Sequence, residues 1–146
     1  MKSCKNILVA IDTSNEAKQV LAAATELGRC FDAKLSLIHV VEPVVTDSSY
    51  DLINTVPLEM DDVLVKHAED FLANLKRDLA PDTDISSSVE LGSVKTEILR
   101  HARENSIDLI VVGSHGRHGL ALLLGSTANA LLHGAPCDVY VVRIKD

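Results

Sequence analysis

The chain alternates short, continuous runs of Val, Leu and Ile with longer stretches in which apolar residues recur every three or four positions. The runs are Asn6-Ile7-Leu8-Val9-Ala10-Ile11-Asp12 and residues 35–41, 107–112 and 137–142. A short apolar run is typical of a strand buried on both faces, as in a parallel sheet. The periodic stretches, over 17–31, over 58–79, from 94 and from 126, have the spacing of amphipathic helices. Strands that alternate with helices predict an α/β fold with right-handed crossovers.

A fifth strand is predicted over Ile85–Leu91, where apolar residues alternate with serines and other polar residues. This alternation is typical of a strand with one exposed face, so we expect it at an edge of the sheet. No boundary or internal repeat interrupts residues 1–146, and this length suits one domain. We therefore expect a single α/β domain whose five-stranded parallel sheet has the order 3-2-1-4-5, with helices on both faces.

The charge balance limits the partners that we expect. The chain carries 14 Lys and Arg against 21 Asp and Glu, a formal net charge of −7. Nucleic-acid backbones and anionic membranes attract basic surfaces, so we expect neither as a partner. No apolar run approaches the roughly 20 residues that span a bilayer, and no signal-like segment precedes the first strand. We expect a cytoplasmic protein whose three cysteines are reduced and mostly buried.

Glycines gather after the most strand-like run of the chain. Four of the seven, Gly113, Gly116, Gly119 and Gly125, fall within thirteen residues. Glycine lets a ligand approach the backbone closely. Ser126 follows at a predicted helix start, where free N–H groups and the helix dipole attract anions. The segment therefore predicts a site for a nucleotide phosphate.

The predicted topology points to the same place. In an open α/β sheet, ligands bind beyond the carboxyl ends of the strands, where the strand order reverses. In the order 3-2-1-4-5 the first and fourth strands flank that point, and their ends carry Asp12 and Gly113. Arg117 and His118 could add positive charge there. Two plainer interpretations stay open: a glycine-rich turn that only connects strand to helix, and a helix-capping role for Asp12.

Motifs of several enzyme classes are absent from the sequence. There is no G-x-x-x-x-G-K-[ST] loop, no G-x-G-x-x-G after the first strand and no G-x-S-x-G elbow. Ser114 and His115 are adjacent, which does not give the geometry of a nucleophile and its base. His115 and His118 lack a third metal ligand at a recognisable spacing. We expect no catalytic residue, no metal site and no enzyme activity.

The sequence resembles the universal stress protein family over its whole length, from Lys5–Asp12 through Leu37–Val41 to the end. Nucleotide-binding members carry G-x-x-G-x9-G-[ST] after their fourth strand, and here Gly113-x-x-Gly116 is followed by eight residues and then Gly125-Ser126. Members that bind no nucleotide, similar to universal stress protein A, have a shorter segment without these glycines. The resemblance implies an adenine nucleotide alpha hydrolase-like, Rossmann-like fold and an adenine nucleotide, ATP or AMP, as ligand.

The resemblance also implies particular contacts. Asp12 resembles the family aspartate beside adenine and ribose, and Ala10 lies where nucleotide binders often have a small residue or proline. Val40 resembles the backbone partner of adenine, although plain sheet core is the other interpretation. Val112 and Gly113 would line the ribose side. The residues that would hold the phosphates are Gly116, Gly125, Ser126 and Thr127.

In function, the resemblance implies a stress-response protein that binds an adenine nucleotide as a dimeric regulatory module. The final strand, over Val139–Val142, would pair across a two-fold axis in a homodimer, because an unpaired apolar edge favours pairing. One alternative is a dimeric protein-interaction module without a nucleotide, similar to universal stress protein A, and the short spacer favours it. The other is a slow ATPase, for which Asp12 is the only candidate base near the phosphates.

Overall fold

The structure, a computed structural model, describes residues 3–43, 58–115 and 124–145. Its strands are β1 (Asn6–Ala10), β2 (Lys34–Val41), β3 (Ile85–Leu91), β4 (Leu109–Gly113) and β5 (Asp138–Val142). Its helices are α1 (Ala17–Phe31), α2 (Leu58–Leu79), α3 (Val94–Glu104) and α4 (Ser126–Gly134). The strands form a parallel sheet in the order β3-β2-β1-β4-β5. This order confirms the predicted α/β topology and places the half-exposed strand β3 at an edge.

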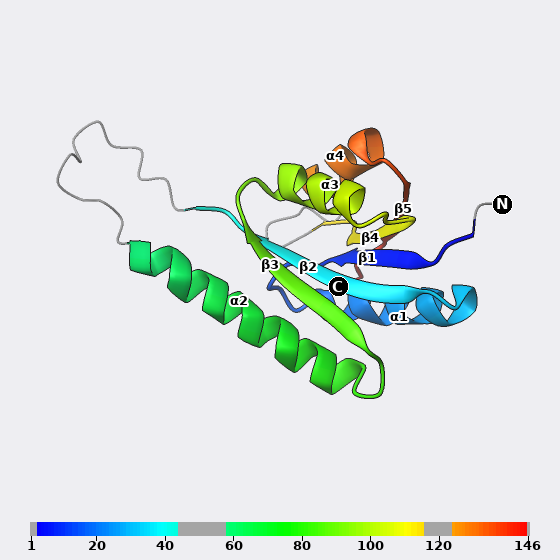
Figure 1. Ribbon diagram of the computed structural model, residues 1–146, viewed down its shortest axis with the longest axis horizontal. Coiled ribbons are helices and arrows are strands. Elements are labelled where there is room, and N and C mark those ends of the chain that lie inside the picture. Colours follow the sequence, from blue (N-terminus) through cyan, green and yellow to red (C-terminus); the bar gives the residue numbers. More distant parts are fainter. Residues whose placement is uncertain (1–2, 44–57, 116–123, 146) are drawn as a thin grey trace.

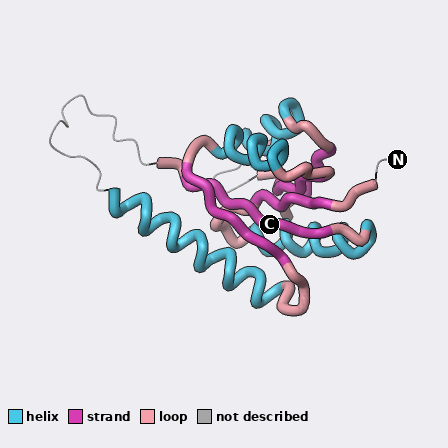
Figure 2. The backbone as a smooth tube through the Cα atoms, viewed as in Figure 1, coloured by secondary structure: helices cyan, strands magenta, loops and turns pink. Residues whose placement is uncertain are grey.

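The sheet is the middle layer of three, with α1 and α2 on one face and α3 and α4 on the other (Figures 1 and 2). Side chains alternate between the faces along each strand. Ile7 and Val9 on β1 pack toward α1 and α2, whereas Leu8 between them packs toward α3 and α4. All three are fully buried. The sequences of the central strands are continuous apolar runs because helices cover both faces of the sheet there.

The helices on the α1 and α2 side are positioned by small and apolar residues. In α1, Gly28 lies so close to β2 that a Cβ there would come within 3.2 Å of the Leu35 side chain. In α2, Ala68 and Leu72 are buried at a spacing of one turn. The helix ends at Leu79, the end of the predicted stretch, and Pro81 follows, a residue that a helix interior disfavours. Within the described ranges, no helix is both long and apolar enough to cross a membrane.

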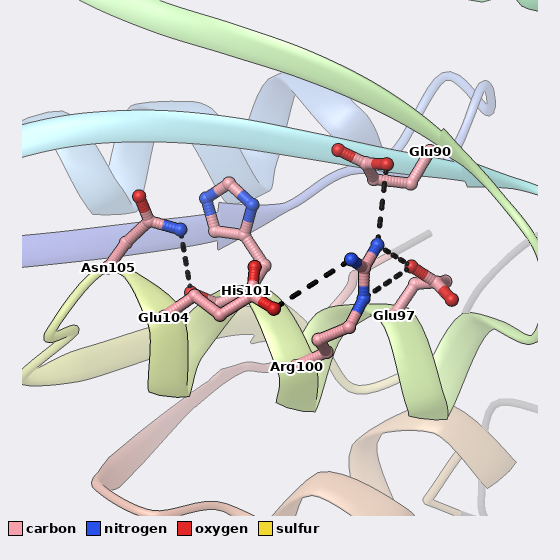
Figure 3. A network of polar contacts seen from close by, with 6 residues as sticks. All are labelled: Glu90, Glu97, Arg100, His101, Glu104 and Asn105. Atoms are coloured by element: carbon pink, nitrogen blue, oxygen red, sulfur yellow. Dashed lines mark hydrogen bonds and ion pairs between the residues drawn. The ribbon is translucent and has the colours of Figure 1, made fainter.

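An arginine joins α3 to the edge strand β3 (Figure 3). The Arg100 guanidinium lies 3.6 Å from Glu90 on β3 and 3.8 Å from Glu104, and it also hydrogen-bonds Glu97 one turn earlier. Its side chain is 49% exposed, and surface ion pairs are each worth at most about 1 kcal/mol. Burial of apolar side chains such as Ile98 therefore holds α3 to the sheet, and Arg100 adds a weaker link.

The structure departs from the sequence prediction at some boundaries and side chains. The first strand ends at Ala10 instead of Asp12, and the fourth begins at Leu109 because Ile107 closes the end of α3 through a 3.1 Å bond from its N–H to a carbonyl oxygen of that helix. The expectation of mostly buried cysteines is wrong. Cys30 is exposed on α1, and the other two thiols, those of Cys4 and Cys137, are half-buried.

Candidate functional site

The carboxyl ends of β1 and β4 lie side by side and open into a cavity of about 980 Å³. After β1 the chain enters α1 on one face of the sheet, whereas α4, the helix after β4, covers the other face. This is the switch point at which ligands bind in open α/β sheets. The cavity lining includes eight of the predicted site residues: Ala10, Asp12, Val40, Val112, Gly113, Gly125, Ser126 and Thr127. The ninth, Gly116, lies outside the described residues, and contact of any of them with a ligand stays a prediction.

Two hydrogen bonds fix the backbone of Ile11, the residue that follows β1. The N–H of Ile11 donates to the carbonyl oxygen of Ile38 over 2.9 Å, and the Ile11 carbonyl oxygen accepts from His39 Nδ1 over 2.7 Å. Both partners belong to β2, so β2 sets the position of Ile11. Asp12 comes next, and its Oδ1 accepts from both the N–H and the hydroxyl of Ser14. Asp12 therefore holds the turn before α1 and does not cap the helix end itself.

The start of α4 is joined to the end of β4. The Gly125 N–H donates to the Ser114 carbonyl oxygen over 2.6 Å, and the Ser114 N–H donates to Val142 on β5 over 2.8 Å. Gly125 is the N-cap in an extended conformation, with no side-chain cap and no acidic residue in the first turn. The first N–H groups of a helix have no intrahelical acceptor. Because the first turn, from Ser126, lines the cavity, this end of α4 offers N–H donors to a ligand.

His115 is a site residue that the sequence analysis did not assign. Among the described residues, it is the one polar or charged residue that is buried, at 9% exposed. Its Nδ1 lies 3.3 Å from the Ser114 hydroxyl, and the residue lines the cavity. No group of three or more metal-ligating side chains occurs in the described ranges, and His118 lies outside them. The signal that could have found His115 is its place two residues after Gly113, at the predicted switch point.

Helix α2 forms a wall of the cavity that the sequence analysis did not predict. Val63 and Leu64 line it, although their residues are 65% and 36% exposed. His67 and Ala68 line it one turn further along. The sequence analysis predicted an amphipathic helix over 58–79 and gave it no part in the site. The apolar residue Val63 was the available signal that this helix also lines a cavity, in addition to packing on the sheet.

The described lining of the cavity carries carboxylates and histidines but neither lysine nor arginine. The carboxylates are Asp12, Glu16 and Glu42, and the histidines are His39, His67 and His115. The pKa of Glu16 is held below its ordinary value, chiefly by hydrogen bonding from Ser14, next by its own backbone, and least by His115. The Ser14 hydroxyl has one proton and also donates to Asp12, so it can donate to only one of the carboxylates of Asp12 and Glu16 at a time. Glu16 is ionised at neutral pH.

The walls and the helix end suit a ligand with a flat apolar part and an anionic group. Val40, Ile98 and Val112 are buried apolar residues of the lining. The exposed amides of α4 are the donors that an anion requires. Arg117 and His118, expected to add positive charge, lie outside the described residues. Fold and cavity together define a doubly wound α/β protein with a ligand-sized cavity at its switch point.

The chain belongs to the universal stress protein family. The family model described as "Universal stress protein family" matches residues 3–143. Among curated relatives, universal stress protein A homolog 2 of Coxiella burnetii (strain RSA 493 / Nine Mile phase I) is 43% identical over 151 residues, covering 99% of each chain. The solved structure of the universal stress protein UspA from Lactobacillus plantarum matches with a TM-score of 0.80 at 28% identity, covering 98% of this chain and 100% of that one.

Two solved structures of the same fold contain adenine nucleotides. One is a universal stress protein in complex with cAMP, with a TM-score of 0.65 and 21% identity, covering 99% of this chain and 100% of that one. The other is the universal stress protein from Archaeoglobus fulgidus in complex with dAMP, with a TM-score of 0.60 and 18% identity, covering 97% of this chain and 99% of that one. At these identities the likeness shows the fold, and the ligands are properties of those proteins.

Proposed function

We propose that this chain is a stress-response protein that binds an adenine nucleotide, ATP or AMP, in the cavity beyond the carboxyl ends of β1 and β4. The supporting observation is that predicted site residues from β1, β2, β4 and α4, far apart in sequence, line one cavity. The complexes of two family members with cAMP and dAMP support the same class of ligand. The protein would act in the cytoplasm.

In the proposed complex, each part of the nucleotide meets a different wall. Adenine lies against the apolar surface of Val40 and Val112, and the small side chain of Ala10 leaves room for it. The ribose hydroxyls donate to Asp12, whose Oδ1 already accepts from Ser14 and whose Oδ2 is the freer oxygen. The phosphate lies at the start of α4, where Ser126 and Thr127 supply the donors and Gly125, whose own N–H is bonded to Ser114, allows a close approach.

Calorimetry with ATP, ADP and AMP tests this function, with Ser126→Asp as the site variant. An acidic residue in the first turn of a helix stabilises that helix, so this variant keeps its fold while a carboxylate occupies the anion position. We expect Ser126→Asp to weaken nucleotide binding at least about tenfold, or about 1.4 kcal/mol. Thr96→Asp, in the first turn of α3 and outside the described cavity lining, is the matched control and should bind like the wild type. The proposal is wrong if the wild type binds no nucleotide or if Ser126→Asp has no effect.

The module is proposed to be a homodimer that pairs through β5. This strand is the last in the sheet order, so one of its edges has no strand beside it within the described residues. Its Tyr140 is 45% exposed, and on the neighbouring helix α4 Leu132 is 49% exposed. An apolar, unpaired strand edge favours addition of another strand, here the β5 of a second copy.

A second candidate function is a dimeric protein-interaction module that binds no nucleotide. The eight-residue spacer between Gly116 and Gly125 favours it, as do curated relatives named as homologues of universal stress protein A. The calorimetry above separates the two, because this module would give no heat with any adenine nucleotide. In both cases the proposed role is not catalytic. Phosphate release from ATP should be no faster with wild-type protein than with Asp12→Asn.

A further inference from the structure

We propose that the cavity prefers adenine ligands of low negative charge, and that Glu16 is a residue that sets this preference. Nucleoside monophosphates and cyclic monophosphates would bind more tightly than the metal-free triphosphate. This inference rests on the proposed function, because it concerns which adenine ligand the same cavity accepts.

The start of α4 is the main source of attraction for an anion in the described cavity. The start of α4 offers backbone N–H groups, and a helix N-terminus is equivalent to roughly half a positive charge. No lysine or arginine lies in the described lining to add a full positive charge. A donor set of this kind suits one phosphoryl group at the helix end, as in AMP or cAMP. It provides little for the second and third phosphoryl groups of a triphosphate.

Carboxylates supply the opposing charge. Asp12 and Glu16 line the cavity just before α1, and Glu42 lines it after β2. His115, which follows β4, lines this cavity as well. Glu16 thus lines the same cavity as Ser126 and Thr127, where the phosphate would lie. Like charges within one cavity repel, and the repulsion rises with the charge of the ligand.

Glu16 remains charged under the conditions in which a nucleotide would bind. Hydrogen bonding from Ser14 lowers its pKa, so protonation does not relieve the repulsion at neutral pH. Its place at the N-cap of α1 adds a favourable interaction with the dipole of that helix. Metal-free ATP carries about four negative charges and AMP about two, since a phosphoryl group contributes up to two. The carboxylates therefore disfavour ATP more than AMP, and AMP more than cAMP.

The test compares the dissociation constants of cAMP, AMP and ATP for the full chain by calorimetry, in EDTA and at fixed ionic strength. We expect metal-free ATP to bind at least about tenfold more weakly than AMP, equivalent to about 1.4 kcal/mol. Glu16→Gln should narrow this ratio at least about threefold by raising ATP affinity. Glu26→Gln removes one charge from the same helix, where its side chain is 72% exposed and outside the described lining, and should leave the ratio unchanged. Excess Mg²⁺ should also narrow the ratio, because it neutralises part of the triphosphate.

Each other result overturns the inference in a recognisable way. ATP binding in EDTA as tightly as AMP would show that charge does not select the ligand, and the proposed nucleotide-binding function would stand. A weak ATP affinity that neither Mg²⁺ nor Glu16→Gln improves would show that shape, not charge, excludes the triphosphate. Failure of cAMP, AMP and ATP to bind would remove the proposed function and this inference together.

Discussion

The N–H of Gly125 donates to the carbonyl oxygen of Ser114 over 2.6 Å, so the start of α4 is hydrogen-bonded to the residue directly after β4. A Cβ on Gly125 would lie 3.1 Å from that same oxygen and 3.2 Å from the Cα of His115. Backbone atoms cannot rotate aside as the end of a side chain can. Glycine at this position therefore permits the close approach that brings the amides of α4 to the cavity.

We expect Gly125→Ala to destabilise the protein by about 1–3 kcal/mol, the usual range for overpacking, and to weaken any nucleotide binding. Gly134→Ala, at the other end of α4, is the matched control. Its Cβ would meet a terminal carbon of Leu99 at 3.2 Å, which can shift, and alanine is the better helix former by up to about 1 kcal/mol. Urea unfolding of both variants measures the difference. Equal stabilities of the two variants would show that the Gly125 contact is not restrictive.

The proposed dimer can be tested at two equally exposed apolar residues on opposite edges of the sheet. Tyr140 on β5 and Leu91 at the end of β3 are each 45% exposed. Tyr140→Lys should convert a homodimer to monomer, because a charged residue on an edge strand opposes strand addition. Leu91→Lys should leave the dimer intact. Light scattering after size-exclusion chromatography gives both masses, and a wild-type monomer or a Tyr140→Lys dimer would contradict pairing through β5.

The thiols should differ in reactivity. Burial raises the pKa of Cys4, and the nearby Asp108 and Asp138 raise it further, while Cys30 is exposed on α1. At pH 8 we expect iodoacetamide to alkylate Cys30 several-fold faster than Cys4, because the thiolate is the reacting form. Mass spectrometry of peptides over time measures both rates. Faster alkylation of Cys4 at this pH would contradict the predicted order.

The same shift predicts how Cys4 affects stability at alkaline pH. Its pKa is higher in the folded protein than in the unfolded chain, so the folded state retains the thiol proton longer. The stabilising contribution is fully present below the unfolded pKa and is lost as the pH rises through the folded value. Unfolding free energies measured between pH 8 and pH 11 should therefore fall less steeply in a Cys4→Ser variant than in the wild type.

Much of the fold could be predicted from the sequence because its local patterns agree with its packing. The run around Ile7 is apolar on both sides because two helical layers cover β1. The bounds of α2 are as predicted, since Pro81 follows the stripe that ends near Leu79. Strand ends were less predictable. Ile11 has the side chain of a strand residue and still bonds to β2, but the chain turns there toward α1.

The position of the candidate site was predictable, whereas its charge and its full outline were not. Strand ends such as Gly113 must lie at one edge of a parallel sheet, which is why distant residues line one cavity. The apolar spacing within α2 does not predict the angle at which this helix crosses the sheet. The contribution of Val63 to the cavity lining was therefore missed. Glu16 lines the cavity just after the turn held by Asp12, a tertiary detail that spacing does not reveal.

The hydrogen bond from His39 to the Ile11 carbonyl oxygen also determines the tautomer of the imidazole. A carbonyl oxygen only accepts, so Nδ1 carries a proton in both the neutral and the charged ring. In the neutral ring Nε2 is therefore the acceptor nitrogen, and the link between β1 and β2 uses Nδ1 alone. His39 also lines the cavity, so one imidazole both joins the two strands and forms part of the wall that they build.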